Sequence, residues 1–173
     1  DSYRFSISWP RVQPTGSGPV DAAGLDFYDR LVDGLLARGI SPMATLYHWD
    51  TPLPVEQAGG WTNRDTAKRL GEFAAIMGER LGDRVPEWVT VNEAATVVMN
   101  GYGLGVHAPD EERLFKAGAV ARNMLLGHGY AVQGLRSAGV SGRIGITNTH
   151  TPCTPAEDTR KDKAMAGLLD FIH

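Results

Sequence analysis

The sequence predicts an α/β fold in which four parallel strands alternate with four helices, the arrangement of half a (β/α)8 barrel. Short apolar runs of strand length alternate with longer stretches of helical apolar spacing. The segments that leave the strands are long, and those that return from the helices are short. A complete (β/α)8 barrel typically needs about 250 residues. The 173 residues of this chain hold four consecutive strand–helix units, which we expect to form one partial domain over residues 1–173.

Four short segments have the apolar alternation, or the continuous apolar character, that is typical of strands. They are Tyr3–Trp9, Pro42–Trp49, Trp88–Glu93 and Arg143–Asn148. Because a helix is expected after each strand, the strands should run parallel and be joined by right-handed crossovers.

The four helices are predicted from apolar residues at helical spacing. They are Gly24–Arg38, Arg64–Leu81, Glu112–Ser137 and Pro155–Ile172. Gly39 and Gly82 suit the C-terminal ends of the first two helices, and Asn63 suits the N-cap of the second. The second helix should bury Ala67, Leu70, Ala74, Met77 and Leu81, and the third has Leu114, Ala121, Leu125 and Val132 at helical spacing.

The long connections all lie at the carboxyl ends of the predicted strands. They are residues 10–23, 50–62, 94–111 and 149–155. Because α/β enzymes place their chemistry in loops at this end of a parallel sheet, the functional face is predicted there. A doubly wound sheet is a weaker alternative, because the prolines of the segment Pro14–Pro19 remove the amide donors that a phosphate-binding turn uses.

Composition excludes several classes of protein. Lys and Arg total 17 against 20 Asp and Glu, so the net charge of −3 predicts no nucleic-acid partner. No apolar run approaches the roughly 20 residues that cross a membrane, so no membrane partner is expected. The start of the chain at Asp1 has neither the basic region nor the apolar run of a secretory signal, and a cytoplasmic location is expected.

A metal or cofactor is not expected. The single cysteine, Cys153, cannot form an internal disulfide or a cysteine zinc site, and no His-x-His or His-Glu-x-x-His spacing occurs. His128 lies in a predicted helix rich in Leu and Ala and is interpreted as a packing residue. His107 and His150 are interpreted as solvated loop residues.

Polar and aromatic residues end the predicted strands on the functional face. His48 and Trp49 end the second strand, Asn92 and Glu93 end the third, and Asn148 ends the fourth. A carboxylate at the end of a buried strand must be paired, hydrogen-bonded or neutral, because an isolated buried charge is costly. The group around Glu93 therefore predicts a functional site.

Four ordered segments make this prediction specific. Tyr3–Arg11, Thr45–Pro52, Gly59–Trp61 and Thr90–Glu93 together resemble glycoside hydrolase family 1, which comprises retaining β-glucosidases and related β-glycosidases on a (β/α)8 barrel. The resemblance implies that the chain runs from the second barrel strand to the helix after the fifth. The first strand and strands six to eight are then expected to be absent.

The resemblance also implies roles for individual residues. Glu93 is expected to be the general acid/base, and Asn92 to hydrogen-bond the 2-hydroxyl of the sugar. His48 is expected to bind a hydroxyl of the non-reducing sugar, and Trp49 to contact that sugar through its ring and indole N–H. Arg4 resembles the arginine that orients the nucleophile and keeps it ionised.

Other features of the site are implied less directly. Tyr102 and Asn148 are expected to contact the aglycone, and the substrate is expected to be a small β-glucoside or oligosaccharide. The family's nucleophile lies in a Glu-Asn-Gly segment that does not occur in this sequence, so the 173-residue chain alone is expected to be inactive. Ala94 also stands where the family usually has proline, which leaves the loop after Glu93 less restrained.

Two alternatives remain. One is another barrel glycosidase with Asn-Glu after the fourth strand, such as an endo-cellulase, which the Tyr-Arg-Phe-Ser and His-Trp-Asp segments disfavour. The other is a non-catalytic half-barrel that binds sugar or self-associates, because four parallel strands without closure expose two sheet edges.

Overall fold

The computed structural model describes residues 1–112, 114–150 and 152–172. One four-stranded sheet has the order β1-β2-β3-β4, and all neighbouring strands pair in parallel. The strands are β1 (Ser2–Ser6), β2 (Ser41–Tyr47), β3 (Glu87–Asn92) and β4 (Arg143–Thr147). The predicted parallel α/β fold is confirmed, but each strand ends one to three residues earlier than predicted. After β2 and β3 the cause is local, since Trp49 and Glu93 adopt positive φ angles of 74° and 47° that turn the chain out of the strand.

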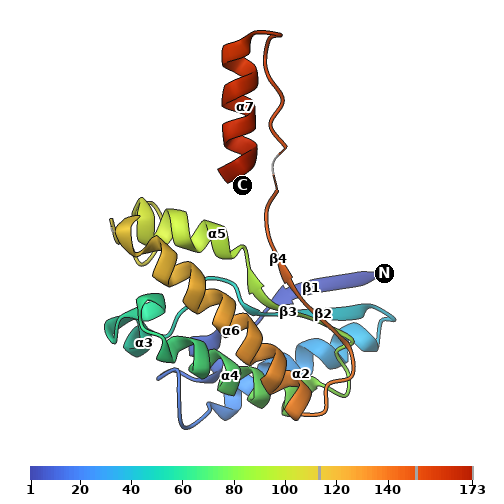
Figure 1. The fold of residues 1–173 in the computed structure, drawn as a ribbon. Coiled ribbons are helices and arrows are strands. Elements are labelled where there is room, and N and C mark those ends of the chain that lie inside the picture. The colour runs from blue at the N-terminus through green and yellow to red at the C-terminus, as the bar shows by residue number, and fades with distance from the viewer. Residues whose placement is uncertain (113, 151, 173) are drawn as a thin grey trace.

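Three long helices connect the strands, and a fourth follows the last strand. They are α2 (Ala22–Leu36), α4 (Asp65–Leu81), α6 (Ala117–Ser137) and α7 (Arg160–Ile172). The long loops at the carboxyl ends of the strands contain shorter helices: α1 (Trp9–Val12), α3 (Leu53–Gln57), η1 (Gly60–Thr62), α5 (Ala94–Thr96), the π-helix η2 (Val97–Gly103) and η3 (Leu114–Lys116). In Figure 1, α7 stands away from the sheet and the other helices, at the end of an extended segment that follows β4.

Gly39 and Gly82 lie at the C-terminal ends of the first two long helices as predicted, whereas α2 begins at Ala22, two residues before the predicted Gly24, and the N-cap of α4 is Arg64 rather than Asn63. Asp21 caps α2 by accepting a hydrogen bond from the Gly24 N–H at 2.8 Å, and Gly39 has the left-handed φ of 69° that a helix-ending glycine supplies. The Asn63 side chain accepts a hydrogen bond from the Asp65 N–H at 3.0 Å, which satisfies a free donor at the start of α4.

The starts of the last two helices were predicted too early. A 3-10 turn precedes Ala117, where α6 begins, and Arg113 lies outside the described residues. The last helix begins at Arg160, five residues after the predicted Pro155. There the Thr159 hydroxyl accepts a hydrogen bond from the Asp162 N–H at 3.1 Å, the arrangement of an N-cap.

Helices α4 and α6 pack closely, and the buried stripe predicted for α4 is confirmed, whereas the apolar spacing of α6 does not mark its buried face. All five predicted residues of α4 are fully buried, whereas Leu125 of α6 is 59% exposed and Leu114 before it is 57% exposed. The buried face of α6 instead carries Val120, Met124, Gly127, Ala131 and Leu135. Gly134 allows α6 to approach α4 with this face inward, because a Cβ at position 134 would collide with the backbone carbonyl of Gly71 on α4. The two helices therefore meet along small residues.

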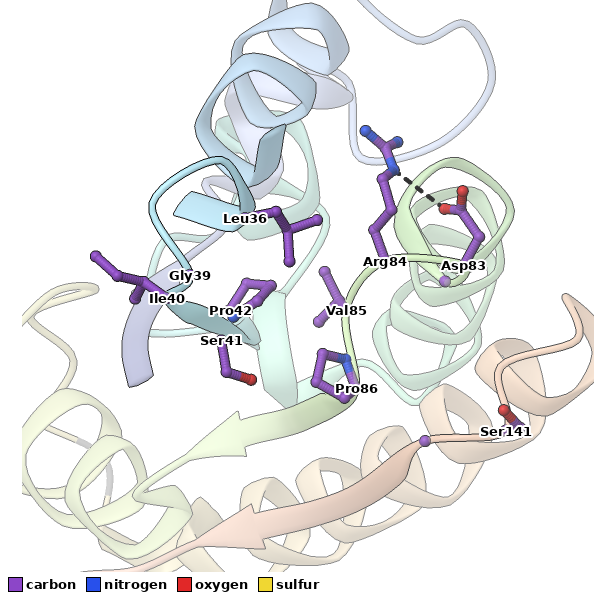
Figure 2. Close-up of a pocket in the computed structure, with 12 residues that line it drawn as sticks. Leu36, Gly39, Ile40, Ser41, Pro42, Asp83, Arg84, Val85, Pro86 and Ser141 are labelled. Carbon is purple, nitrogen blue, oxygen red and sulfur yellow. Dashed lines mark hydrogen bonds and ion pairs between the residues drawn. The ribbon is translucent and has the colours of Figure 1, made fainter. Parts of the chain in front are cut away.

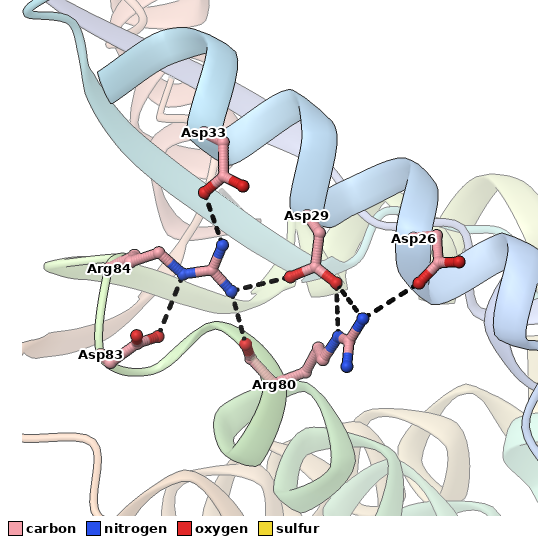
Figure 3. A network of polar contacts seen from close by, with 6 residues as sticks. All are labelled: Asp26, Asp29, Asp33, Arg80, Asp83 and Arg84. Carbon is pink, nitrogen blue, oxygen red and sulfur yellow. Dashed lines mark hydrogen bonds and ion pairs between the residues drawn. The ribbon is translucent and has the colours of Figure 1, made fainter. Parts of the chain in front are cut away.

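An ion-pair network joins α2 to the end of α4 (Figure 3). Asp29 accepts hydrogen bonds from both Arg80 and Arg84, and the contact to Arg84 is 2.7 Å. Asp26 and Asp33 extend the network along α2, at 3.0 Å from Arg80 and 2.6 Å from Arg84 respectively. The hydrogen bond that Arg84 donates to Asp29, together with its bonds to the neighbouring carboxylates of Asp33 and Asp83, raises the pKa of Arg84 above its usual value.

We predict that Asp29→Asn lowers the free energy of unfolding by about 1–2 kcal/mol, since charge-assisted hydrogen bonds in a partly buried network are stronger than exposed pairs. The Asp29 side chain is only 16% exposed. Lys68→Gln is the control, because the side chains of the Lys68–Asp65 pair are 56% and 63% exposed and solvent screening makes the contribution of this pair much smaller. Urea unfolding followed by circular dichroism measures both variants, and equal losses would contradict the prediction.

His128 of α6 packs against β3 as the sequence predicted, with its Nδ1 2.7 Å from the Thr90 hydroxyl. Burial lowers the pKa of His128 below its usual 6.5, because the charged imidazolium loses hydration. The unfolded chain therefore binds more protons than the folded chain between the lowered pKa and 6.5. We predict that the free energy of unfolding falls as the pH decreases through this window, and that His128→Gln flattens this part of the profile. The midpoint of urea unfolding, measured between about pH 5 and 7, reports this pH dependence. Profiles of the same slope for wild type and His128→Gln would contradict the prediction.

A hollow of about 500 Å³ lies among the short connections at the amino ends of the strands (Figure 2). Apolar side chains such as Leu36, Pro42 and Val85 line it, and its charged residues, Asp83 and Arg84, bond to each other. This end of the sheet is opposite the predicted functional face, so the hollow is not the candidate site.

Candidate active site

The carboxyl ends of the strands bring together the side chains of Arg4, His48 and Asn92. Arg4 lies on β1, His48 follows β2 directly, and Asn92 is the last residue of β3. The strand register aligns Asn92 with Thr147 of β4, so a fourth strand adds a hydroxyl group. These residues are up to 143 positions apart in the sequence and meet because the strands are parallel.

Arg4 and Asn92 form the centre of this cluster. Arg4 donates from Nε to the Thr45 hydroxyl at 2.9 Å and from Nη2 to Asn92 Oδ1 at 2.5 Å. The Thr147 hydroxyl donates to the same Asn92 oxygen at 3.0 Å. Asn92 is only 3% exposed, and these donors satisfy an amide oxygen that would otherwise be costly to bury.

His48 joins the cluster at its exposed edge. Its Nε2 lies 3.3 Å from Asn92 Nδ2, and its Nδ1 lies 2.9 Å from the Ser6 hydroxyl. Both ring nitrogens therefore have protein partners, and the ring is held at the solvent-facing end of the strands. This placement leaves the imidazole within reach of a ligand.

Trp49 lies beside His48, with the ring centroids 5.1 Å apart in an edge-on arrangement. The left-handed φ of 74° at Trp49 directs the indole back over β3, where its N–H donates to the Asn92 carbonyl at 2.9 Å. The indole N–H that was expected to contact a sugar is therefore used inside the protein. The ring also packs against His107 at 5.5 Å between centroids, a contact that the sequence did not indicate.

Glu93 is held at the mouth of the cluster by its backbone and by one neighbouring hydroxyl. Its N–H donates to the Thr147 carbonyl at 2.8 Å, which continues the pairing of β3 with β4. The Thr96 hydroxyl donates to Glu93 Oε2 at 3.1 Å. The side chain is half-buried, so this carboxyl group can exchange a proton with a bound molecule. A half-buried carboxyl group that directly follows Asn92 in the chain is suited to acid–base chemistry on a polar substrate.

Tyr102 is not brought into this cluster. It lies in the π-helix η2, is 1% exposed, and accepts a hydrogen bond from the Trp61 N–H at 2.9 Å. Its hydroxyl donates to the Glu56 carboxylate at 3.0 Å. Burial, together with the Glu56 charge, raises the pKa of Tyr102, and burial also raises the pKa of Glu56. Tyr102 also lines a hollow together with Trp49 and Glu56, and its contact with an aglycone stays a prediction.

The structure places Asn148 and Asp50 near the cluster without joining them to it. Asn148 follows Thr147 and is exposed at the end of β4. Asp50 accepts a hydrogen bond from the Ser8 hydroxyl, which fixes the turn after β2 to the turn after β1. Ser6 and Thr147 also belong to this cluster, and the sequence analysis did not name them as site residues. The alternation of side chains along a strand, which puts Ser6 on the same face as Arg4, could have indicated Ser6.

Within residues 1–112, 114–150 and 152–172, no group of three or more His, Cys, Asp or Glu side chains could hold a metal ion. None of the helices in this described part of the chain has the length and apolar character to cross a membrane.

A parallel α/β sheet with these groups at the carboxyl ends of its strands is typical of α/β enzymes. Comparison with known proteins assigns the family. The family model "Glycosyl hydrolase family 1" matches residues 1–172, and the chain belongs to this family. The resemblance seen in the sequence is confirmed.

Relatives and solved structures agree with this assignment. Beta-glucosidase A of Thermotoga maritima is 42% identical over 161 residues, which cover 93% of this chain and 36% of the relative. Thermostable beta-glucosidase B of Thermobispora bispora is 49% identical over 154 residues, which cover 89% of this chain and 32% of the relative. The structure of the Thermotoga maritima family 1 β-glucosidase in complex with isofagomine lactam has a TM-score of 0.92 and 41% identity, covering 98% of this chain and 38% of that one. The chain thus spans about a third to two-fifths of the length of these proteins.

Proposed function

We propose that this chain is the part of a retaining β-glycosidase that carries the general acid/base, and that its four strand–helix units form half of a (β/α)8 barrel. One observation carries the proposal: Glu93 follows directly after Asn92, whose buried amide is held by Arg4 and Thr147 at the carboxyl end of the sheet. Family membership supports the reaction class. We propose small β-glucosides or oligosaccharides as substrates.

In the proposed reaction, Glu93 donates its proton to the glycosidic oxygen as the bond from that oxygen to the anomeric carbon breaks. A second carboxylate attacks the anomeric carbon from the opposite face and forms a glycosyl ester. Water then attacks the same carbon, gives its proton to Glu93 and releases the second carboxylate. The Glu-Asn-Gly segment that carries this second carboxylate in the family does not occur in these 173 residues, and the proposal assigns the second carboxylate to another part of the parent enzyme.

The remaining site residues have supporting roles in this proposal. Asn92 hydrogen-bonds the sugar 2-hydroxyl, a contact that strengthens in the transition state. His48 binds a further sugar hydroxyl, and the Trp49 ring contacts the sugar. The Arg4 guanidinium favours ionisation of the second carboxylate through its positive charge. For Asn148, a contact with the aglycone stays a prediction.

The experiment is a chimera in which residues 1–172 replace the aligned part of Thermotoga maritima Beta-glucosidase A. We expect the chimera to hydrolyse 4-nitrophenyl β-glucoside, with the β-anomer of glucose as the first product seen by NMR. A folded chimera that releases no nitrophenol, or that forms the α-anomer first, would refute the proposal. The 173-residue chain alone is expected to show no release above the uncatalysed rate.

Self-association through open sheet edges is a second candidate function. β1 and β4 form the two edges of the sheet, and four of the five residues of β1 are exposed, including Tyr3 at 51%. An exposed edge strand is a template for pairing with another chain. We propose that the 173-residue chain self-associates at micromolar concentration. Sedimentation velocity tests it, and a single monomeric species would exclude it.

A further inference from the structure

The geometry points to Ser6 and Thr147 as positioning residues that, together with Arg4, fix the orientation of the Asn92 amide and the tautomer of His48. In this arrangement His48 presents a nitrogen that only accepts a hydrogen bond, and Asn92 presents N–H groups that only donate. The assignment of the two residues rests on the hydrogen-bond network itself. Its meaning for a sugar rests on the proposed function.

The orientation of the Asn92 amide follows from its partners. A guanidinium group has donors and no acceptor, so the Asn92 atom that lies 2.5 Å from Arg4 Nη2 must be the oxygen. The Thr147 hydroxyl, at 3.0 Å from the same atom, donates its proton there as well. The opposite orientation would place an NH2 group against the guanidinium in a position that is 3% exposed, with a buried donor left unsatisfied.

The tautomer of His48 follows in turn from the amide. With its oxygen toward Arg4, Asn92 directs Nδ2 at His48 Nε2, 3.3 Å away. An amide nitrogen only donates, so His48 Nε2 must carry a lone pair. A neutral imidazole then has its proton on Nδ1, which donates to the Ser6 hydroxyl at 2.9 Å. Ser6 is thus the acceptor that stabilises this tautomer.

Thr147 ties the amide to the general acid proposed above. Its hydroxyl lies 3.4 Å from Arg4 Nη2 and donates to Asn92, while its carbonyl accepts the Glu93 N–H at 2.8 Å. A single residue of β4 therefore contacts both Asn92 and Glu93. Loss of the Thr147 hydroxyl would leave the Asn92 oxygen with one donor and loosen the amide without removing any group that touches the sugar.

The consequence for a sugar is a directional pattern of hydrogen bonds. A hydroxyl that reaches His48 Nε2 must donate its proton to the lone pair that Asn92 Nδ2 also faces, whereas the 2-hydroxyl that binds the second hydrogen of Asn92 Nδ2 must accept one. The two hydroxyls are therefore recognised in different ways. We expect a sugar with fluorine in place of the hydroxyl at His48 to lose that contact, because fluorine cannot donate.

The first test measures the tautomer in the 173-residue chain without any sugar. Long-range ¹H–¹⁵N NMR of the ¹⁵N-histidine-labelled chain distinguishes an imidazole protonated at Nδ1 from one protonated at Nε2. The signals of His48 are those that disappear in His48→Gln. We expect the Nδ1–H pattern for the wild type, a shift toward mixed tautomers in Ser6→Ala, and recovery in Ser6→Thr. An Nε2–H pattern in the wild type would overturn the inference even if no variant folds. An unchanged pattern in folded Ser6→Ala would overturn the role of Ser6.

The second test measures Thr147 in the active chimera. Thr147→Val is expected to lower kcat/KM for an aryl β-glucoside about tenfold, the loss of roughly one charge-assisted hydrogen bond in the transition state, and Thr147→Ser is expected to restore it. For the 2-deoxy sugar, which cannot bond to Asn92, wild type and Thr147→Val should be equal. Equal losses on both sugars would show a merely structural role and overturn the assignment. An inactive chimera would refute the proposed function and leave the NMR result standing on its own.

Discussion

In the chimera with Thermotoga maritima Beta-glucosidase A, Glu93→Gln is expected to lower kcat/KM by about 10²–10⁴-fold, the usual contribution of general acid–base assistance. Glutamine keeps the size of the side chain and can still accept the hydrogen bond from Thr96, at 3.1 Å in the wild type. It cannot deliver a proton. The loss should grow with the basicity of the leaving group, so alkyl β-glucosides should lose more activity than nitrophenyl β-glucosides.

The matched control is Glu87→Gln on the same strand. Glu87 is the first residue of β3, at the opposite end from Glu93, and pairs with Arg143. The kcat/KM of the Glu87→Gln chimera should stay within about twofold of that of the unmodified chimera, because an ion pair far from the site contributes mainly to stability. A loss below tenfold for Glu93→Gln on alkyl glucosides would assign the acid to another residue.

The second large effect concerns the contact between α4 and α6. Gly134→Ala is expected to lower the free energy of unfolding by about 3 kcal/mol or more, or to prevent folding, because overpacked contacts between backbones cannot relax by changing a rotamer. A Cβ at this position would overlap the Gly71 carbonyl oxygen and lie 3.0 Å from the Ala75 nitrogen. The helices would have to separate, which would also loosen the buried side chains between them.

Gly129→Ala on the same helix is the control. A Cβ at Gly129 meets no atom within 4 Å, so the higher helix propensity of alanine should stabilise the chain by about 0.5–1 kcal/mol. The same chemical change is thus expected to have opposite signs on two faces of α6. Urea unfolding measures both variants, and a stabilised Gly134→Ala would contradict the packing described here.

Periodicity predicted the fold where a segment had one clear apolar face. The stripe from Ala67 to Leu81 was right because large side chains mark it. The apolar spacing that includes Leu125 did not mark the buried face of α6, because the close contact with α4 is set by Gly134, which gives no hydrophobic signal, beside the buried Leu135. The early ends of β2 and β3 were missed because the left-handed backbone at Trp49 and Glu93 has no marker in residues that rarely adopt it.

For the site, sequence reasoning found the strand-end residues but not how they are connected. Arg4, His48 and Asn92 were predicted, and the structure brings them into one cluster. The contacts from Ser6 and Thr147 depend on strand register, which a single sequence does not reveal. Tyr102 was predicted as an aglycone contact from the family resemblance, and its hydrogen bond to Glu56 could not be read from the sequence.

The left-handed backbone at Trp49 and Glu93 sets a limit on engineering this protein for heat resistance. Each non-glycine residue in that conformation costs about 1–2 kcal/mol, and glycine would relieve that cost at either position. Glycine would also delete the indole or the carboxyl group that we propose for catalysis and sugar binding. Thermostable variants should therefore be sought on the outer helices, for example at Gly129, while the two strained positions are kept as they are.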